Sequence, residues 1–449
     1  GSRLFQSRLY NCIVGSFFIQ KCCLFAHFCV YLHYKSFHYL IMPSEIILIS
    51  ISGEDKPGVT ASITEFLGQY NATILDIGQA DIHHTLSLGI LFKMDSAEHS
   101  GHILKDILFR CSELGVQVRF TPVTEEKYNN WVVRQGKSRY VVTVLGRMIT
   151  ARQIGLVTKA VSEQQLNIDS IKRLTGRPSL DEKDLDHLRS CVEFSVRGEL
   201  VDKNLFSTKF LEISAQEGID ISFQKDDMYR RNRRLICFDM DSTLIKTEVI
   251  DELADRAGVG EQVRAITESA MRGEIDFNES FRQRVALLKG LDESVMREIA
   301  ENLPIMDGAD RLMSVLKKCG FKIAILSGGF TYFGQYLQKR FGVDYVYANQ
   351  LEIEDGKLTG RHLGDIVDGK RKAELLNLIA QVEKIELEQV IAVGDGANDL
   401  PMLNLAGLGI AFHAKPKVKE NARQSISTIG LDGILYFLGF RDVHLDSIL

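Results

Sequence analysis

The chain has 449 residues, enough for about three domains of ordinary size. Hydrophobic residues make up 45% of it and charged residues 25%, as in a typical globular protein with a buried core. The formal net charge is −5, and the one dense basic run, at 230–234, is short and typical of a solvated linker. This charge pattern excludes the basic footprint of a nucleic-acid-binding protein, so we expect no nucleic-acid partner.

Cysteine usage indicates a reducing compartment. The sequence holds eight cysteines, and half of them crowd the first thirty residues without forming a C-x-x-C pair. A small disulfide-stabilised framework requires regularly spaced, paired cysteines, which this chain lacks. We therefore expect a cytoplasmic protein.

Residues 1–41 differ in composition from the rest of the chain. They hold four basic and no acidic side chains and are rich in Phe, Tyr, Cys and His. Lys21 interrupts the apolar run before either side reaches the ~18 residues that a membrane span requires, and Ser and Arg are too sparse for a typical transit peptide. We expect a non-native or disordered segment ahead of Met42 and no membrane partner; a signal or anchor sequence is the alternative.

Residues 42–125 show the βαββαβ order of a ferredoxin-like module. Hydrophobic periodicity predicts its six elements at 46–51, 59–70, 73–82, 87–93, 102–114 and 116–120. Pro57 stands at the start of the first helix, where its fixed φ is favourable. The pair His83-His84 falls between two strands, where a solvated turn is a simpler interpretation than a metal site. Residues 126–135 are polar and predict a linker with Trp131 as a packing anchor.

Residues 137–225 repeat the same order, which indicates a duplication at the scale of a whole domain rather than a solenoid. The predicted elements lie at 140–146, 151–164, 167–173, 191–197, 203–216 and 220–223. The D-K-P-G string of the first module is absent, and residues 147–150 have the sequence R-M-I-T instead. In the first module, the free N–H groups at the start of the first helix could receive a ligand carboxylate. The same role is harder to assign to the second module, because it lacks this string.

Polar residues follow three apolar strands in the C-terminal half, residues 226–449. The strand at 235–238 ends in Asp239-Met240-Asp241-Ser242-Thr243, and later strands end in Ser327-Gly328-Gly329 and in Gly394-Asp395-Gly396-Ala397-Asn398-Asp399. An isolated D-x-D is more often a surface turn. Because the carboxyl ends of parallel strands collect chemistry at one edge of a sheet, three such endings predict a shared site.

These strings resemble the haloacid dehalogenase-like superfamily and, within it, the phosphoserine phosphatases. The similarity rests on DMDSTLI, EVIDELA, SGGFT and GDGANDL, and it extends from about residue 234 to the end of the chain. The two βαββαβ modules resemble ACT domains. The resemblance implies an α/β fold in which a Rossmannoid parallel sheet with a helical cap, at about 246–303, follows two ferredoxin-like ACT-like domains.

The resemblance also implies a mechanism at the acidic residues. Asp239 would be the nucleophile that forms an aspartyl-phosphate, and Asp241 would act as acid and then as base. Mg²⁺ would be held by the Asp239 side chain, the Asp241 backbone carbonyl and the Asp395 side chain, with Asp399 orienting that shell. Clustered carboxylates on a loop suit Mg²⁺, which prefers oxygen ligands.

The resemblance also implies which residues bind the phosphoryl group. Ser327 and Gly328 would hold its oxygens through a hydroxyl and backbone N–H groups. Lys372 would supply a positive charge; Lys370 and Arg371 lie beside it, and the K-A-E-L-L string favours Lys372.

The amino-acid part of the substrate would contact cap residues. The resemblance implies that Glu248 binds the ammonium group and Arg284 the carboxylate, and it places Asn398 among the substrate contacts. A guanidinium can donate two parallel hydrogen bonds to a carboxylate. The simpler alternative for Glu248 and Arg284 is ordinary surface charge on the cap.

The implied function is Mg²⁺-dependent hydrolysis of O-phospho-L-serine, the last step of serine biosynthesis. The resemblance also implies that an amino-acid effector binds the ACT-like domains and that the protein forms a homodimer. Two alternatives stay open. The substrate could be another phosphomonoester, with transfer to water or to an alcohol, or the protein could be an amino-acid sensor with a vestigial phosphatase half.

Overall fold

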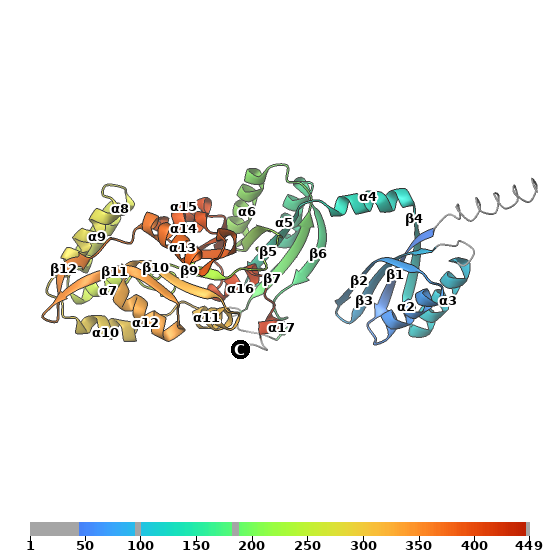
Figure 1. Cartoon of the computed structure of the whole chain (residues 1–449), viewed down its shortest axis with the longest axis horizontal. Helices are drawn as coiled ribbons and strands as arrows, with labels where there is room; N and C mark the ends of the chain where they lie inside the picture. The colour runs from blue at the N-terminus through green and yellow to red at the C-terminus, as the bar shows by residue number, and fades with distance from the viewer. Residues whose placement is uncertain (1–44, 95–99, 182–187, 446–449) are drawn as a thin grey trace, which may run out of the picture. The chain divides into compact units, whose positions relative to one another are not determined.

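A computed structural model describes residues 45–94, 100–181 and 188–445 (Figure 1). The segment 1–41, predicted to be non-native or disordered, lies outside these residues. The chain forms two compact units, one ending at Gly136 and the other beginning at Lys137. Across the described ranges, no helix is both long enough and apolar enough to cross a membrane.

The N-terminal unit contains a four-stranded antiparallel sheet in the order β2-β3-β1-β4. Alternate side chains of β3, among them Leu88, Ile90 and Phe92, are buried, as expected for a strand with one covered face. They share a core with Ile63 and Ile107 of the two helices. The elements are β1 (Glu45–Glu54), α2 (Val59–Gln69), β2 (Thr73–Ile82), β3 (Thr85–Met94), α3 (Ser100–Leu114) and β4 (Gln117–Val123).

The predicted linker at 126–135 lies between the two modules and is helical, as α4 (Glu125–Gln135). Thr124 caps it, because its Oγ1 accepts a hydrogen bond from the backbone N–H of Lys127 at 3.2 Å. No residue of α4 is buried, and Trp131 is exposed, so the prediction of Trp131 as a packing anchor was wrong. The apolar side chains of this helix are therefore not part of a buried core in the described chain.

The second module has the same strand order as the first, β6-β7-β5-β8. Each element lies within two residues of its predicted range, which confirms the duplicated ferredoxin-like fold. The elements are β5 (Arg139–Gly146), α5 (Ala151–Glu163), β6 (Asn167–Arg173), β7 (Ser190–Arg197), α6 (Lys203–Glu217) and β8 (Asp220–Lys225).

A seven-stranded sheet organises the rest of the chain, in the order β12-β11-β10-β9-β13-β14-β15. All neighbouring strands run parallel except β11 and β12, which form a hairpin at one edge. The strands are β9 (Leu235–Phe238), β10 (Lys322–Phe330), β11 (Tyr345–Glu354), β12 (Lys357–Leu363), β13 (Val390–Gly394), β14 (Leu408–Phe412) and β15 (Gln424–Ile426).

The two faces of this sheet have separate cores. Leu235 and Cys237 pack with α13 (Gly369–Glu383) and α14 (Leu400–Leu405), and these helices flank the strands in Figure 1. Ile236 and Phe238 belong to the opposite core, because successive side chains of a strand alternate between faces. That core includes α11 (Ala309–Lys318), α12 (Thr331–Phe341) and α16 (Ile434–Phe437); α15 (Pro416–Asn421) and α17 (Asp442–Leu445) complete the helices of the sheet domain.

Four helices between β9 and β10 form a cap, as the sequence predicted for about 246–303. They are α7 (Val249–Arg256), α8 (Gly260–Met271), α9 (Phe277–Ala286) and α10 (Ser294–Glu301). The chain enters and leaves the cap side by side, because Ile245 and Ile305 form an antiparallel bridge.

The second ACT-like module and the sheet domain are packed together within one unit, which the sequence did not predict. Leu145, Leu174 and Cys191 belong to the same buried cluster as Tyr436 and Phe437. At the sheet edge, the Gln424 amide accepts a hydrogen bond from Phe223 N at 3.0 Å and donates one to Phe223 O at 2.7 Å. The side-chain amide of Gln424 thus makes the pair of hydrogen bonds with the backbone of Phe223 that a neighbouring strand would otherwise make.

Asp220 provides a buried polar contact of this interface. Its carboxylate is 2% exposed and accepts hydrogen bonds from the backbone N–H groups of Ser427 and Thr428, each at 2.9 Å. The Thr428 hydroxyl donates to it at 2.6 Å. These bonds hold the segment after β15 against the start of β8.

Replacing Asp220 with alanine should lower the free energy of unfolding of this unit by about 2–3 kcal/mol, because several donors lose their acceptor. Urea unfolding followed by circular dichroism measures the change. Glu163→Ala is the matched control, since this exposed carboxylate makes only a 4.0 Å surface pair with Lys159. A loss no larger than that of the control would show that the interface does not depend on Asp220.

Candidate active site

The three polar strand endings meet because β9 lies between β10 and β13. The register places Phe238 beside Ile325 of β10 and Val393 of β13. The residues that follow these positions therefore emerge together at the carboxyl edge of the sheet, where ligands bind in open α/β sheets.

Asp239 and Asp241 are both buried, so the D-x-D string is not a surface turn. Asp239 continues the sheet through a hydrogen bond from its N–H to Val393 O at 2.9 Å, and its Oδ1 accepts one from Met240 N at 2.7 Å. Ser242 then has a left-handed backbone, with φ +55°. Because β9 already ends at Phe238, the alternation of side chains between the two faces of a strand need not apply to Asp239 and Asp241.

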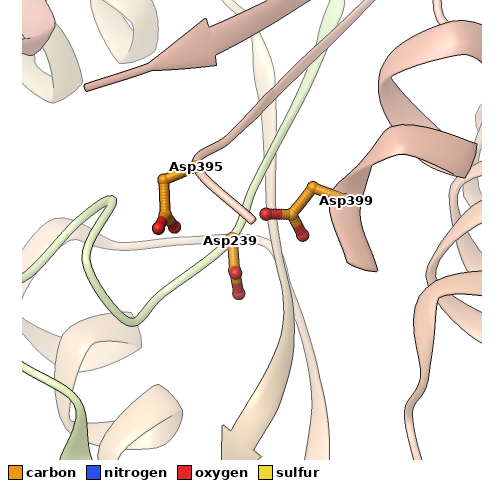
Figure 2. Close-up of side chains that lie close together, drawn as sticks. All are labelled: Asp239, Asp395 and Asp399. Carbon is orange, nitrogen blue, oxygen red and sulfur yellow. The ribbon is translucent and has the colours of Figure 1, made fainter. Parts of the chain in front are cut away.

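Three carboxylates from two strand ends gather around one point (Figure 2). One ligand atom from each of Asp239, Asp395 and Asp399 lies within 4.8 Å of the others. Burial, followed by repulsion from Asp399, raises the pKa of Asp395 to about 7 and raises that of Asp239 as well. Gly394 permits the loop after β13 to fold back on itself, because a Cβ at this position would lie 2.5 Å from Asp399 Cγ.

This cluster is suited to a metal ion. Its donors are carboxylate oxygens, which hard cations such as Mg²⁺ and Ca²⁺ prefer. A divalent cation would also offset the repulsion that raises the pKa values of Asp239 and Asp395. The Asp241 side chain is not in the cluster, which agrees with an assignment of its backbone carbonyl alone as a ligand.

Lys372 is the cation built into the site. It is fully buried near the start of α13, and its Nζ lies 2.7 Å from Asp399 Oδ1 and 2.9 Å from Asp239 Oδ1. Burial alone would lower the pKa of Lys372, but the two carboxylates outweigh it and raise the pKa. Its neighbours Lys370 and Arg371 instead pair with Glu374 outside the site.

The Asp241 carboxyl group occupies a separate position, toward the cap. Its Oδ1 accepts a hydrogen bond from Val249 N, at the start of α7, at 3.0 Å. Burial, and next the negative charge of Glu248, raise the pKa of Asp241 to about 8. A Cβ on Gly329 would lie 2.3 Å from Asp241 Oδ2, so this close approach requires glycine.

Ser327 and Gly328 lie where the pairing of β10 with β11 is irregular. The Ser327 hydroxyl accepts a hydrogen bond from Gly329 N at 2.9 Å and lies 3.5 Å from Asp241 Oδ2. Sequence reasoning missed Asn349, which is buried on β11. Its amide donates to Gly328 O and accepts from Val367 N, both at 2.8 Å, and thereby ties this loop to the segment before α13.

The cap places Glu248 and Arg284 near the acidic residues. The Glu248 carboxylate accepts a hydrogen bond from Ser242 Oγ at 2.8 Å, and partial burial raises the pKa of Glu248. Burial lowers the pKa of Arg284, which lies in the field of Glu248 and Asp241 without an ion pair to any described carboxylate. Asn398 lies on the loop between Asp395 and Asp399, against Gly369.

The cap also touches the sheet domain directly at the site. A Cβ on Gly328 would lie 3.0 Å from the ring of Phe277, on α9. Asn278 donates to Asp368, the residue that caps α13, at 3.5 Å. These contacts place the cap helices over the residues that surround Asp239.

Comparison with protein families gives the class to which this fold and site correspond. A haloacid dehalogenase-like hydrolase model matches residues 233–407, and ACT domain models match 45–121 and 138–224. The structure is thus that of a haloacid dehalogenase-like hydrolase that carries two ACT domains. The resemblance that the sequence motifs implied is confirmed.

Individual relatives narrow this class. Phosphoserine phosphatase SerB2 of Mycobacterium tuberculosis is 38% identical over 400 residues, which cover 89% of this chain and 94% of that protein. Phosphoserine phosphatase of Archaeoglobus fulgidus is 39% identical over 345 residues, with coverages of 77% and 95%. The chain therefore belongs to the phosphoserine phosphatase family.

Solved structures show a similar arrangement. An unliganded probable phosphoserine phosphatase from Vibrio cholerae matches with a TM-score of 0.54 and 34% identity, over 70% of this chain and 90% of that one. A HAD family hydrolase from Salmonella enterica matches with a TM-score of 0.56 and 32% identity, over 67% and 98%.

Proposed function

We propose that this protein hydrolyses O-phospho-L-serine to L-serine and phosphate through an aspartyl-phosphate on Asp239. The observation that carries the proposal is the position of the Asp239 carboxylate, 2.9 Å from the buried Lys372 and within an acidic cluster at the carboxyl edge of the sheet. Relatives that align along nearly the whole chain are named phosphoserine phosphatases, which supports the choice of substrate.

Two steps account for the chemistry. An Asp239 oxygen attacks phosphorus in line, and the bond from phosphorus to the serine oxygen breaks as the Asp241 carboxyl group donates its proton to that oxygen. Water then attacks the aspartyl-phosphate, and Asp241 accepts the proton of that water. Phosphate leaves, and the Asp239 carboxylate is restored.

Other groups hold the phosphoryl oxygens during both steps. Lys372 provides a positive charge, and Ser327 with the N–H groups around Gly328 provides hydrogen-bond donors. We assign Mg²⁺ to the Asp239 and Asp395 side chains and the Asp241 backbone carbonyl, with Asp399 orienting that shell. When bound, the cation adds charge neutralisation at the same oxygens.

Phosphate release from L-phosphoserine, compared with a panel of other phosphomonoesters, tests the function. The expected result is release that favours phosphoserine, requires added Mg²⁺ and stops on addition of a chelator. Equal release from all phosphomonoesters would contradict the assignment of phosphoserine as the substrate, but it would leave the assignment of Asp239 as the nucleophile intact. Serine binding without any turnover would instead favour the amino-acid sensor.

The choice of substrate depends on Glu248 and Arg284. An anionic and a cationic side chain at the same site match the ammonium and carboxylate groups of a zwitterionic amino acid, and we include Asn398 among the substrate contacts. Arg284 has no carboxylate of the described chain in ion-pair distance, which leaves its guanidinium fork available.

Replacing Arg284 with alanine should raise KM for phosphoserine about 10- to 100-fold, because a charged hydrogen-bonding pair is lost. Steady-state kinetics with phosphoserine and with p-nitrophenyl phosphate measure the effect. The second substrate has no carboxylate and should be affected little. Arg282→Ala is the control on the same helix, since Arg282 is exposed and makes only a 3.7 Å surface pair with Glu279. Equal losses on both substrates would show a structural role.

We further propose that the chain has domains at 42–125, 137–225 and 226–449. We also propose that it forms a cytoplasmic homodimer and that an amino-acid effector regulates it.

The first module is the better candidate for the binding site of this effector. Gly58 has φ +96° at the start of α2, and no side chain caps this helix. In the second module, Thr150 and Gln153 close the start of α5 with a capping box. Calorimetric titration with L-serine and other amino acids tests this, and sedimentation tests the dimer.

A further inference from the structure

A pocket of about 430 Å³ lies at the edge of the sheet opposite the active site. It is lined by residues 230–234, directly before β9, and by residues 319–321, directly before β10. Phe440 and Leu438 complete its wall. The sequence predicted a solvated linker at 225–234; Arg231, Asn232 and Arg234 are exposed as expected, but Arg230 is only 6% exposed, so the prediction was wrong for that residue.

Four arginines of this short segment line the pocket, and two of them form ion pairs with carboxylates. Arg230 Nη2 lies 2.6 Å from Glu193 Oε2, and Arg231 Nη2 lies 3.4 Å from Asp226. Among the described residues, no carboxylate lies within ion-pair distance of the other two. The lining residues include no carboxylate, so about two of the four positive charges lack an ion-pair partner.

The two unneutralised arginines make only neutral contacts. Arg233 Nη1 donates to the backbone oxygens of Glu388 and Val390, at 2.5 and 3.4 Å, and Arg234 Nε donates to Asn232 Oδ1 at 3.1 Å. The Nε atoms of Arg230 and Arg233 are buried without a hydrogen-bond partner. Burial lowers the pKa of Arg233 to about 10, and the more distant carboxylates of Asp227 and Glu388 offset only part of this effect.

A solvated linker does not account for this arrangement. Five consecutive residues, 230–234, line a concave space that is large enough for a small ligand, with Arg230 buried and Arg231 and Arg234 exposed. On the far side of the pocket, Phe321 and Phe440 are half-buried and offer apolar surface. The pocket thus joins concentrated positive charge to a short apolar wall.

We propose that this pocket binds a phosphate group, either as inorganic phosphate or as a phosphomonoester whose organic part lies against Phe321 and Phe440. A phosphate carries about two negative charges at neutral pH, equal to the number of lining arginines without an ion-pair partner, whereas a carboxylate carries one. Guanidinium forks also match its oxygens with paired hydrogen bonds. The site is separate from the catalytic phosphate position, and its assignment does not depend on the proposed function.

Cys319 supplies a local probe of the pocket. It lines the wall and is exposed, whereas Cys111, Cys191 and Cys237 are buried. In the full-length protein, the rate at which N-ethylmaleimide modifies Cys319 is followed by peptide-resolved mass spectrometry, which separates this cysteine from all others. Sodium phosphate, adenosine monophosphate, adenosine and sodium chloride are compared at constant ionic strength.

Phosphate and adenosine monophosphate should each slow the modification of Cys319 several-fold, while chloride and adenosine should not. If adenosine monophosphate protects Cys319 at lower concentrations than phosphate does, the ligand is a phosphomonoester. If the two protect at equal concentrations, the ligand is inorganic phosphate. Protection by chloride equal to that by phosphate, or by adenosine equal to that by its monophosphate, would overturn the proposal.

A pair of variants separates this pocket from the catalytic site. The double change Arg231→Gln and Arg234→Gln removes two exposed charges from the wall and should raise the half-protecting phosphate concentration about tenfold or more. The control, Arg177→Gln with Arg297→Gln, removes two exposed arginines elsewhere in the same unit and should change nothing. Unchanged protection in the first variant would also overturn the proposal.

Discussion

Replacement of Asp239 by asparagine should lower kcat for phosphoserine by about 10⁴-fold or more, because an amide cannot serve as the nucleophile. Phosphate release at saturating substrate and Mg²⁺ measures the loss. The substitution keeps the shape of the side chain and leaves Lys372 paired with Asp399, so the variant should fold. Activity above about 1% of the parent would mean that another group forms the bond to phosphorus.

Two controls make this result specific. Asp355→Asn changes the same residue type at an exposed turn with φ +50°, a conformation that asparagine accepts, and should keep full activity. Circular dichroism should show that Asp239→Asn is folded and at least as stable as the parent, because burial and neighbouring carboxylates already disfavour the ionised form of Asp239. A folded, stable and inactive variant isolates the chemical role.

The site could be predicted from sequence because its residues follow recognisable strands. An apolar run that ends in D-x-D locates Asp239 and Asp241, and the strand order then brings the endings at 327–329 and 394–399 to the same edge. Gly329 and Gly394 are glycines for a reason that only coordinates show. Each faces a carboxylate of the candidate site at a distance that excludes a Cβ.

What the sequence did not show lies in contacts between segments that are far apart along the chain. Asn349 has no motif around it, and its importance comes from bonds to residues 21 and 18 positions away. The same holds for the interface between Gln424 and Phe223. Local periodicity detects which face of a strand is buried, but it cannot identify which distant backbone a single amide will pair with.

The charged stretch at 230–234 shows the limit of composition as evidence. Short basic runs are usually solvated, and nothing local distinguishes this one. Arg230 is nevertheless buried, because it pairs with Glu193, and Arg233 is partly buried because the carbonyl oxygens of Glu388 and Val390 accept its hydrogen bonds. The tertiary structure thus turns a linker into the wall of a pocket.

Replacement of Lys372 by methionine should have the second largest effect, on both activity and stability. Its ammonium group is the only side-chain cation among the described residues in direct contact with Asp239. We expect kcat to fall about 10²- to 10³-fold, because charge on the phosphoryl oxygens loses a preorganised partner. We also expect a loss of about 3–5 kcal/mol in stability, since two buried carboxylates lose their counter-ion.

The pH dependence of this destabilisation tests its cause. Lys372 lowers the pKa of Asp239, so removing it should raise that pKa further above the value in the unfolded chain. A carboxyl group with a raised folded-state pKa is tolerated when protonated and costs stability as the pH rises through that pKa. Urea unfolding in the absence of metal should therefore show a larger difference from the parent at about pH 8 than at about pH 5.

Lys370→Met provides the matched comparison, because Lys370 lies two residues away on the same helix and is 86% exposed. It should change neither kcat nor the pH dependence of unfolding. A stability loss in Lys372→Met that is independent of pH would point to lost packing of the long side chain rather than to lost charge. Loss of activity with unchanged stability would mean that the two carboxylates do not need Lys372 for folding, and that Lys372 acts mainly on the phosphoryl group.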